Sequence, residues 1–173
     1  MPLIHSRVID DRWLGVLTIV TDSDAGQILV TGPDVPTMDL HRVPGARSSE
    51  LIPIGTRRGE DLVLTVGGVP ATIRPGPGRL RRRSHDVEVD IGTLRFRARN
   101  GPRSSTLLRN GRDLGELYLH RVDGDLTAVV DWSDDGDTVT PDAVIGYVLA
   151  IAFGTGADHA AVMVAHGVLG MWS

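Results

Sequence analysis

The sequence predicts a mainly β fold: an antiparallel closed barrel of about 12 strands around a hydrophobic helix near the C-terminus. Two observations lead to this prediction. Between residues 3 and 132, short runs of alternating or β-branched residues are broken by Gly, Pro, Asp and Asn, which is typical of short strands joined by tight turns. After them, residues 141–153 are apolar on every side, so a helix formed there must be surrounded. We expect one domain spanning residues 1–173.

The strand pattern repeats along the first three quarters of the chain. The predicted strands are 3–9, 13–20, 27–31, 37–43, 50–54, 61–66, 69–74, 79–83, 86–91, 93–99, 105–109, 115–121 and 126–132. Several breaks between them are hairpin signals, namely Gly67-Gly68, Asn100-Gly101, Asn110-Gly111 and Asp123-Gly124. No βαβ rhythm is present. Many short strands with short turns favour an antiparallel sandwich or a closed barrel.

The predicted helix has signals at both ends. Thr140 is a suitable N-cap, Pro141 fits the first turn, and Asp142 complements the positive end of the helix dipole. Gly154 can end the helix in a left-handed conformation. The helix reaches about 20 Å, short of the ~30 Å hydrocarbon core of a membrane. We therefore expect it to lie inside the barrel, with no membrane-spanning segment. Residues 159–172 fit a second short helix, which we favour, or a buried strand.

The composition limits the chemistry of the chain. Of the 173 residues, 41% are hydrophobic and 23% are charged, as in globular proteins. Cysteine is absent, which excludes disulfides and thiolate metal sites. The first residues lack a basic segment followed by an apolar run, so we expect no signal peptide and a cytoplasmic location.

Charge is distributed unevenly along the chain, whose formal net charge is −4. Residues 74–112 hold 11 arginines and 3 acidic residues, a charge of +8. Residues 113–173 hold 1 arginine and 10 acidic residues, a charge of −9. Such asymmetry indicates either a surface for a charged partner or pairing between the two segments.

The basic segment contains the candidate anion-binding residues. The predicted strand 93–99 alternates apolar residues with arginines, so its exposed face carries three guanidinium groups. A guanidinium group can bind phosphate or carboxylate through two hydrogen bonds. With the arginines of 79–83, the candidates are Arg79, Arg81, Arg83, Arg95, Arg97 and Arg99. The alternative is a solvated face whose arginines pair with the acidic C-terminal third.

The acidic segment before the helix has the spacing of a calcium loop. Counting from residue 131, oxygen-bearing side chains fall at positions 1, 3, 5 and 12, with glycine at position 6. The candidate ligands are Asp131, Ser133, Asp135, Asp137 and Asp142. The twelfth residue is Asp rather than the longer Glu, and no helix precedes the segment, so a Ca²⁺ site here has low affinity. The alternative is an acidic turn that caps the backbone. We expect no other cofactor.

No motif indicates a catalytic centre. The six histidines show no metal-ligand spacing, and the sequence contains no P-loop, nucleophile elbow or zinc-protease helix. We therefore expect a non-enzymatic protein. An enzyme remains the alternative if the barrel is hollow and holds an internal cavity.

The order of elements resembles a known family. Many strands followed by an apolar C-terminal helix are similar to the tubby-like barrel of tubby C-terminal domains, plant LURP-one-related proteins and phospholipid scramblases. Residues 109–117, followed by 126–130 and the helix, resemble the closing part of LURP-one-like chains, and the acidic residues 131–142 resemble the segment before the scramblase helix. The resemblance implies a helix threaded through a closed barrel and a module that binds lipid or another anion. The segment 159–173 departs from it.

We expect the protein to bind an anionic small molecule or a lipid headgroup through the arginines of residues 79–99. The alternative is a structural or assembly protein, in which the basic segment 74–112 and the acidic segment 113–173 meet between copies of the chain or with a partner protein. Nucleic acid is the less favoured ligand, because the chain is acidic as a whole.

Overall fold

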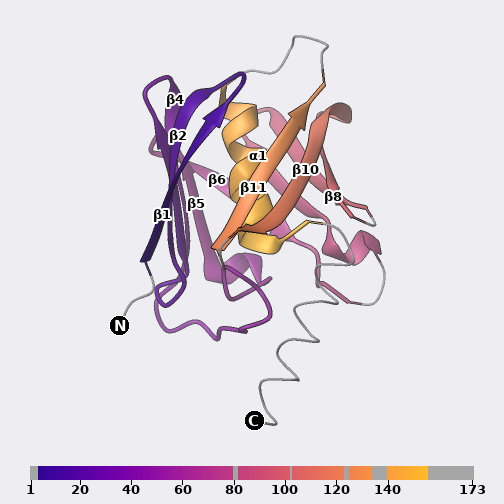
Figure 1. Cartoon of the computed structure of the whole chain (residues 1–173). Coiled ribbons are helices and arrows are strands. Elements are labelled where there is room, and N and C mark those ends of the chain that lie inside the picture. The colour runs from indigo at the N-terminus through magenta and orange to yellow at the C-terminus, as the bar shows by residue number, and fades with distance from the viewer. Residues whose placement is uncertain (1–3, 80–81, 102, 123–124, 134–139, 156–173) are drawn as a thin grey trace.

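The computed structural model describes residues 4–79, 82–101, 103–122, 125–133 and 140–155. These residues form a mainly β structure, in which one antiparallel sheet of 11 strands curves around the helix α1 (Thr140–Phe153). In Figure 1 the indigo and purple strands form one wall, the magenta to orange strands form the facing wall, and α1 lies between them.

Each strand is paired with the next strand along the chain. The strands are β1 (Ile4–Asp11), β2 (Gly15–Asp22), β3 (Gln27–Gly32), β4 (Val35–Arg42), β5 (Leu62–Val66), β6 (Val69–Pro75), β7 (Val87–Ile91), β8 (Leu94–Asn100), β9 (Ser105–Arg109), β10 (Arg112–Val122) and β11 (Asp125–Trp132). Two short 3-10 turns, η1 (Gly59–Asp61) and η2 (Arg82–His85), precede β5 and β7.

Tight hairpins produce this sequential order. Gly67 and Gly68, with φ angles of 58° and 80°, connect β5 to β6. Asn110 and Gly111, with φ angles of 49° and 83°, connect β9 to β10. Positive φ at both central residues matches the right-handed twist of the flanking strands. Both turns confirm the sequence prediction.

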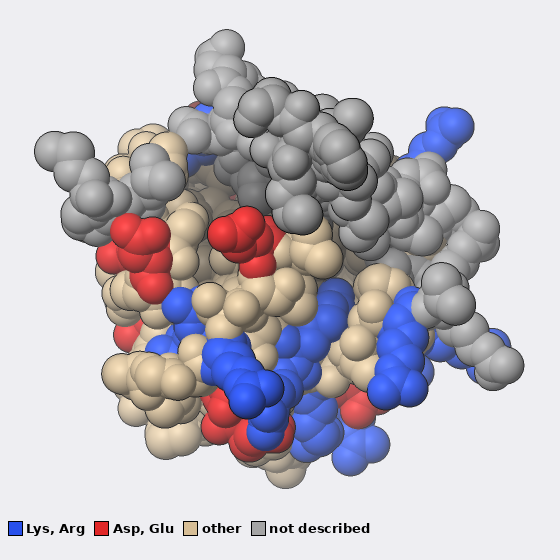
Figure 2. Space-filling model, turned by 90° about the horizontal axis from the view of Figure 1, so that it is seen from below, with Lys and Arg blue, Asp and Glu red and all other residues tan. Residues whose placement is uncertain are grey.

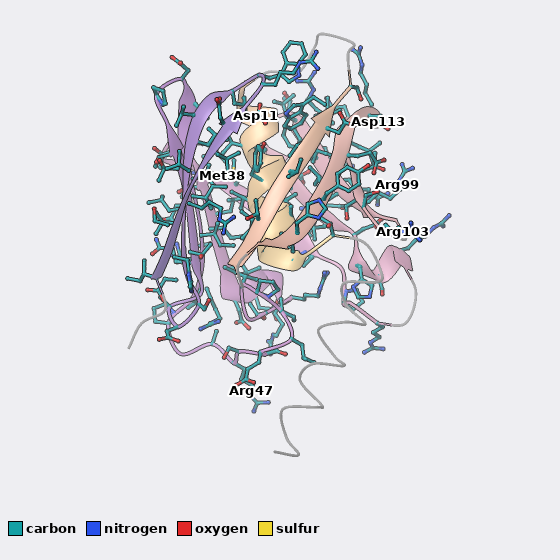
Figure 3. The ribbon with its side chains drawn as sticks, viewed as in Figure 1. Asp11, Met38, Arg47, Arg99, Arg103 and Asp113 are labelled. Carbon is teal, nitrogen blue, oxygen red and sulfur yellow. The ribbon has the colours of Figure 1, made fainter. Side chains whose placement is uncertain are left out.

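The helix α1 fills the interior, as predicted. It packs against β3 and β4 on one wall and against β8, β9, β10 and β11 on the other. Val144, Ile145, Val148 and Leu149 are at most 1% exposed. Because the axis is occupied by these side chains, the described structure is not the hollow barrel that the enzyme alternative requires. Figure 3 shows Met38 between the strands and α1, whereas Arg99 and Arg103 point away from the sheet.

Two glycines, one at the end of α1 and one in its middle, make specific contacts. Gly154 has a φ of 78° and donates its backbone N–H to the Ala150 carbonyl, 2.9 Å away, which confirms the predicted left-handed end. Gly146 lies against the wall: a Cβ atom there would meet the side chains of Leu117 and Leu107 at 3.1 and 3.2 Å. The absence of a side chain at this position therefore lets the helix approach β9 and β10 closely.

The hydrogen-bonded ladder is open, and it has 11 strands rather than about 12. Within the described residues, β1 and β11 are the two edges, and no ladder joins them. In a sequential antiparallel sheet with an odd number of strands, the first and last strands run in the same direction, so they cannot complete an antiparallel ladder. The prediction of a closed barrel is therefore not confirmed at the level of backbone pairing.

Side chains connect the two edge strands. The Arg7 guanidinium of β1 donates to the Thr127 hydroxyl of β11. Asp11, at the end of β1, accepts hydrogen bonds from the Trp132 indole of β11 at 3.1 Å and from the Tyr147 hydroxyl of α1. The first strand, the last strand and the helix are thus joined through polar groups where the backbone ladder stops.

The predicted strand 50–54 is wrong: this segment consists of turns. Pro53 lacks a backbone N–H, and Gly55 has a φ of 92°, so neither continues a ladder. The segment instead lies at the end of α1, where the Ile54 N–H donates to the Ala152 carbonyl at 3.1 Å.

The predicted strand 79–83 is also wrong in its described part. Arg79 is in a loop, and η2 begins at Arg82. The chain folds back on itself here, because the Ser84 hydroxyl donates to the Arg79 carbonyl at 2.8 Å and the Gly78 N–H donates to the Ser84 carbonyl at 2.7 Å. The segment has no alternating apolar residues to hold a strand against the core.

In the described part of the chain, no helix has the length and apolar character needed to cross a membrane. The expected second helix at 159–172 lies outside the described residues.

Candidate anion-binding groove

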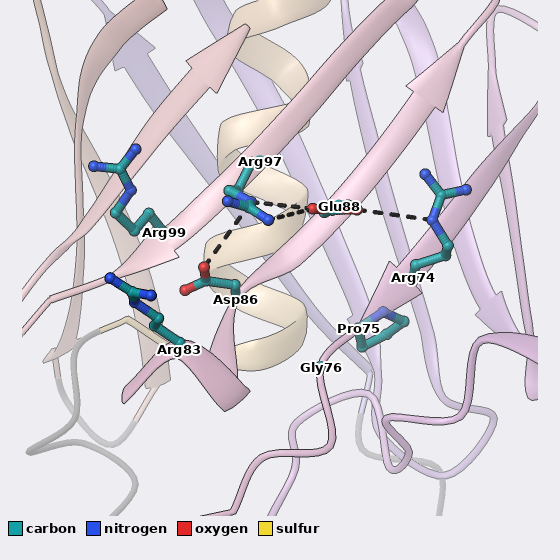
Figure 4. A pocket seen from close by; sticks show the side chains of 8 residues that line it. All are labelled: Arg74, Pro75, Gly76, Arg83, Asp86, Glu88, Arg97 and Arg99. Atoms are coloured by element: carbon teal, nitrogen blue, oxygen red, sulfur yellow. Dashed lines mark hydrogen bonds and ion pairs between the residues drawn. The ribbon is translucent and has the colours of Figure 1, made fainter. Parts of the chain in front are cut away.

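Three neighbouring strands and the turn η2 surround an open groove of about 680 Å³ on the outer face of the sheet. Figure 4 shows its side chains: Arg83 and Arg99 lie on one side of Asp86, and Glu88 and Arg74 lie on the other. The lining residues are Arg74, Pro75, Gly76, Arg83, Asp86, Glu88, Arg97 and Arg99.

The strand register brings charged side chains of three strands into one row. Arg74 of β6 is paired with Glu88 of β7, and Glu88 is paired with Arg97 of β8. On β8 the buried Phe96 and Ala98 alternate with the exposed Arg97 and Arg99, as a half-buried strand requires. The alternation predicted for residues 93–99 is therefore confirmed.

The row is held by ion pairs. One oxygen of Glu88, Oε1, accepts hydrogen bonds from Arg97 Nη2 at 2.5 Å and from Nε at 3.1 Å. The other oxygen, Oε2, lies 3.8 Å from Arg74 Nε. Arg97 Nε also lies 4.0 Å from an Asp86 oxygen. Glu88 therefore stands between two guanidinium groups, and Arg97 between two carboxylates.

A second row lies next to the first, outside the groove lining. Asp90 accepts a hydrogen bond from Arg74 Nη2 at 2.5 Å and lies 3.4 Å from Arg95 Nε. The hydrogen bond from Arg74 lowers the pKa of the Asp90 carboxyl and raises the pKa of Arg74. Both groups are charged at neutral pH, so the pair is a stable part of the surface.

The charges of these two rows cancel. Arg74, Arg95 and Arg97 are matched by three acidic side chains from β7 and the residue before it, Asp86, Glu88 and Asp90. Arg83 and Arg99 have no such partner: within the described residues, neither side chain forms a hydrogen bond or an ion pair. The excess positive charge of the groove therefore comes from Arg83 and Arg99.

Arg57 anchors the loop that carries Arg83, residues 76–86. Arg57 Nη1 donates to the carbonyls of Gly76 and His85, at 3.2 and 3.4 Å, which lie at the two ends of the loop. Its guanidinium group stacks on the ring of Phe153, 5.2 Å from the ring centroid. Burial lowers the pKa of Arg57 to about 10, so this group is still charged at neutral pH.

Where the two ends of this loop meet, close backbone contact leaves no room for a side chain on Gly76. The Gly76 N–H donates to the Asp86 carbonyl at 2.8 Å. A Cβ atom on Gly76 would lie 2.4 Å from the Ser84 carbonyl oxygen. The groove wall at this point therefore requires glycine.

The structure brings three of the six predicted anion-binding residues together. Arg83, Arg97 and Arg99 line the groove. Arg95 lies on the adjacent row with Asp90, Arg79 is exposed in the loop outside the lining, and Arg81 lies outside the described residues.

The sequence analysis missed Arg74 and the local acidic partners. Arg74 is at the end of the correctly predicted strand 69–74, but only the register between strands shows that it faces Glu88. The alternative in which the arginines pair with the acidic C-terminal third is wrong for Arg74, Arg95 and Arg97. Within the described residues, their ion pairs are with the three acids of the basic segment itself.

Figure 2 shows the distribution of charge on one end of the molecule. Basic side chains gather on one part of this surface, with acidic side chains between them, and do not form an uninterrupted basic face.

The predicted calcium loop falls largely outside the described residues. Asp135, Asp137 and the side chain of Asp142 are not among them. Asp131 is exposed at the end of β11, and the backbone of Ser133 donates to the Leu114 carbonyl at 3.0 Å. Within the described part of the chain, no three acidic or histidine side chains come close enough to hold a metal ion.

No family model, curated protein or solved structure matches the chain in the three comparisons with known proteins. The geometry of the groove is therefore the basis for the function inferred below.

Proposed function

We propose that the protein is a binding module for an anionic ligand, a small molecule or a lipid headgroup, held by Arg83 and Arg99. One observation supports this proposal above the others: among the described residues of the groove, Arg74 and Arg97 have carboxylate partners, whereas the exposed guanidinium groups of Arg83 and Arg99 have none. Each can form two charge-assisted hydrogen bonds to the oxygens of a phosphate or carboxylate group. The volume of about 680 Å³ suits a ligand of headgroup size.

The architecture supports a relationship to the tubby-like, LURP-one-related and scramblase barrels, which we include in the proposal. The shared feature is an apolar helix enclosed by sequential antiparallel strands. In this view the side-chain links from β1 to β11 take the place of the closing ladder. The resemblance to these barrels favours a lipid headgroup among the anions that fit the groove.

A double variant tests the proposal. Wild-type protein should sediment with vesicles that contain an anionic phospholipid, or bind inorganic phosphate in calorimetry. It should not sediment with vesicles of phosphatidylcholine alone. Replacing Arg83→Ala and Arg99→Ala removes the unpaired groups, and we expect affinity to fall about tenfold for each arginine. Arg47→Ala removes an exposed arginine outside the groove and is the matched control. Equal binding by the double variant and the control would contradict the proposal.

A second candidate function is assembly with another copy of the chain. Exposed apolar side chains on the outer face of β1 and β2 favour it: Ile4 is 58%, Val8 65% and Val16 49% exposed. Such assembly could use either charged or apolar contacts, and light scattering over a range of salt concentrations distinguishes the two. Contacts between the basic and acidic segments weaken as salt is added, whereas contacts through the apolar residues persist.

A further inference from the structure

We propose that the groove selects a phosphate monoester over a diester or a polyphosphate, and that Glu88 is the residue that sets this limit. The inference rests on the proposed anion binding and adds the class of ligand and the origin of its selectivity.

The first step is the charge that the groove offers. Among the described residues, its lining contains four arginines and two acidic residues, a formal charge of +2. The neighbouring pair of Arg95 and Asp90 adds no net charge. A phosphate monoester carries a charge of about −1.5 to −2 at pH 7 and has three terminal oxygens. Its charge therefore matches that of the two unpaired guanidinium groups, and its three terminal oxygens offer them more acceptors than the two terminal oxygens of a diester, which carries one charge.

The second step is what happens to additional negative charge. Asp86 and Glu88 lie on the groove lining between the unpaired arginines and Arg74, as Figure 4 shows. A tripolyphosphate that reaches past Arg83 and Arg99 meets these two carboxylates. Like charges repel each other, so Asp86 and Glu88 set an upper limit on the negative charge of the ligand.

The third step identifies Glu88 as the controlling side chain. Its two oxygens engage Arg97 at 2.5 Å and Arg74 at 3.8 Å, so one carboxylate occupies both arginines. Without that charge, Arg74 still has an ion-pair partner in Asp90 at 2.5 Å, but the remaining partner of Arg97 is Asp86, at 4.0 Å. Neutralising Glu88 therefore releases Arg97 toward the groove and raises the formal charge of the lining from +2 to +3.

Calorimetric titrations with three soluble anions test this inference. The anions are phenyl phosphate (a monoester), diphenyl phosphate (a diester) and inorganic tripolyphosphate. For wild type we expect phenyl phosphate to bind about tenfold more tightly than either of the others. For Glu88→Gln we expect the affinity for tripolyphosphate to rise about tenfold, so that the preference for the monoester disappears.

Two further variants separate the charge of Glu88 from its role in folding. Glu88→Asp keeps a carboxylate at the same position and should keep the wild-type preference. Glu60→Gln removes an exposed carboxylate that pairs with Arg58 outside the groove and should change nothing. If Glu88→Gln does not fold, the role of the Glu88 charge is read instead from Arg97→Gln, which leaves Glu88 without its closest partner. That variant should discriminate against tripolyphosphate more strongly than wild type does.

Vesicle binding shows whether the monoester is part of a membrane lipid or a soluble molecule. Sedimentation with vesicles that contain phosphatidic acid, whose headgroup is a monoester, is compared with vesicles that contain phosphatidylglycerol, a diester. Binding to phosphatidic acid vesicles with weak binding of free phenyl phosphate assigns the ligand to a membrane, and tight binding of free phenyl phosphate assigns it to solution. Equal binding of both vesicle types and of all three soluble anions would overturn the selectivity but keep the proposed anion binding. If no variant binds any anion, both are overturned.

Discussion

At the scale of single residues, the Asp11 carboxylate has the largest structural role. It is 5% exposed and accepts four hydrogen bonds. Two come from the backbone N–H groups of Trp13 and Leu14, at 2.8 and 3.0 Å, and two from the side chains of Trp132 and Tyr147. A buried carboxyl group is tolerated when its oxygens are this fully hydrogen bonded. Burial and the hydrogen bond to Asp11 raise the pKa of Tyr147, so its hydroxyl keeps the proton that it donates.

We predict that Asp11→Ala lowers the free energy of unfolding by about 3 kcal/mol, because buried donors lose their acceptor. Urea denaturation measures this change. Asp10→Ala, at the exposed neighbouring position of β1, is the control and should change stability by less than about 0.5 kcal/mol. A difference of similar size in both variants would contradict the role assigned to the carboxylate.

The ion pair of Arg74 and Asp90 should make the stability of the protein depend on pH. The pKa of Asp90 is lowered in the folded protein, so the unfolded chain binds its proton more readily. Its stabilising contribution is therefore present above the unfolded pKa of about 3.9 and is lost as pH falls through the lower folded value. We expect wild type to exceed Asp90→Asn in stability by about 0.5 kcal/mol at pH 6, and the difference to shrink as pH falls below about 3.9. Urea denaturation on both sides of this pH provides the comparison, and a difference that does not shrink in acid would refute the ionic contribution.

At the scale of elements, α1 determines whether the chain folds at all. Leu149 is 1% exposed and belongs to the hydrophobic core inside the sheet, where a carboxylate would be removed from solvent. We predict that Leu149→Asp prevents folding, because burying an unpaired carboxylate costs at least several kcal/mol. Circular dichroism should show no cooperative melting transition. Val63→Asp, on an exposed position of β5, is the matched control and should melt near the wild-type temperature.

Elements were predictable from the sequence where local signals agree with one another. The hairpins at 67–68 and 110–111 and the helix before Gly154 combine apolar periodicity with residues that suit the required backbone angles. Segment 50–54 is not a strand because a tertiary contact, the bond from Ile54 to Ala152, decides its conformation. Segment 79–83 is not a strand because hydrogen bonds between nearby residues fold the chain back at this point. For the groove, the alternating arginines of β8 were visible in the sequence. The partners Arg74 and Glu88 were not, because strand register is a property of the folded sheet.

At the scale of the whole molecule, the seam between β1 and β11 distinguishes this fold from a fully paired barrel. Ten pairings join the 11 strands, and side chains of Arg7, Asp11, Trp132 and Tyr147 span the remaining interval. Polar contacts between side chains constrain the edges less uniformly than a continuous ladder does, since each acts at one point along the strand. The seam is therefore the part of the described sheet where local opening costs least.

Hydrogen exchange followed by NMR tests this view of the seam. We predict that the amides of β1 and β11 that are not bonded to β2 or β10 exchange at least about 100-fold faster than amides of the central strands β4, β8 and β9, because they lack a partner in the ladder. In Asp11→Asn, which keeps the shape of the side chain but removes its charge, exchange should accelerate further in β1 and β11 while β8 is unchanged. Uniform protection across all 11 strands would show that the two edges are paired in solution, and the links through Asp11 would then be an addition to a closed ladder rather than a substitute for it.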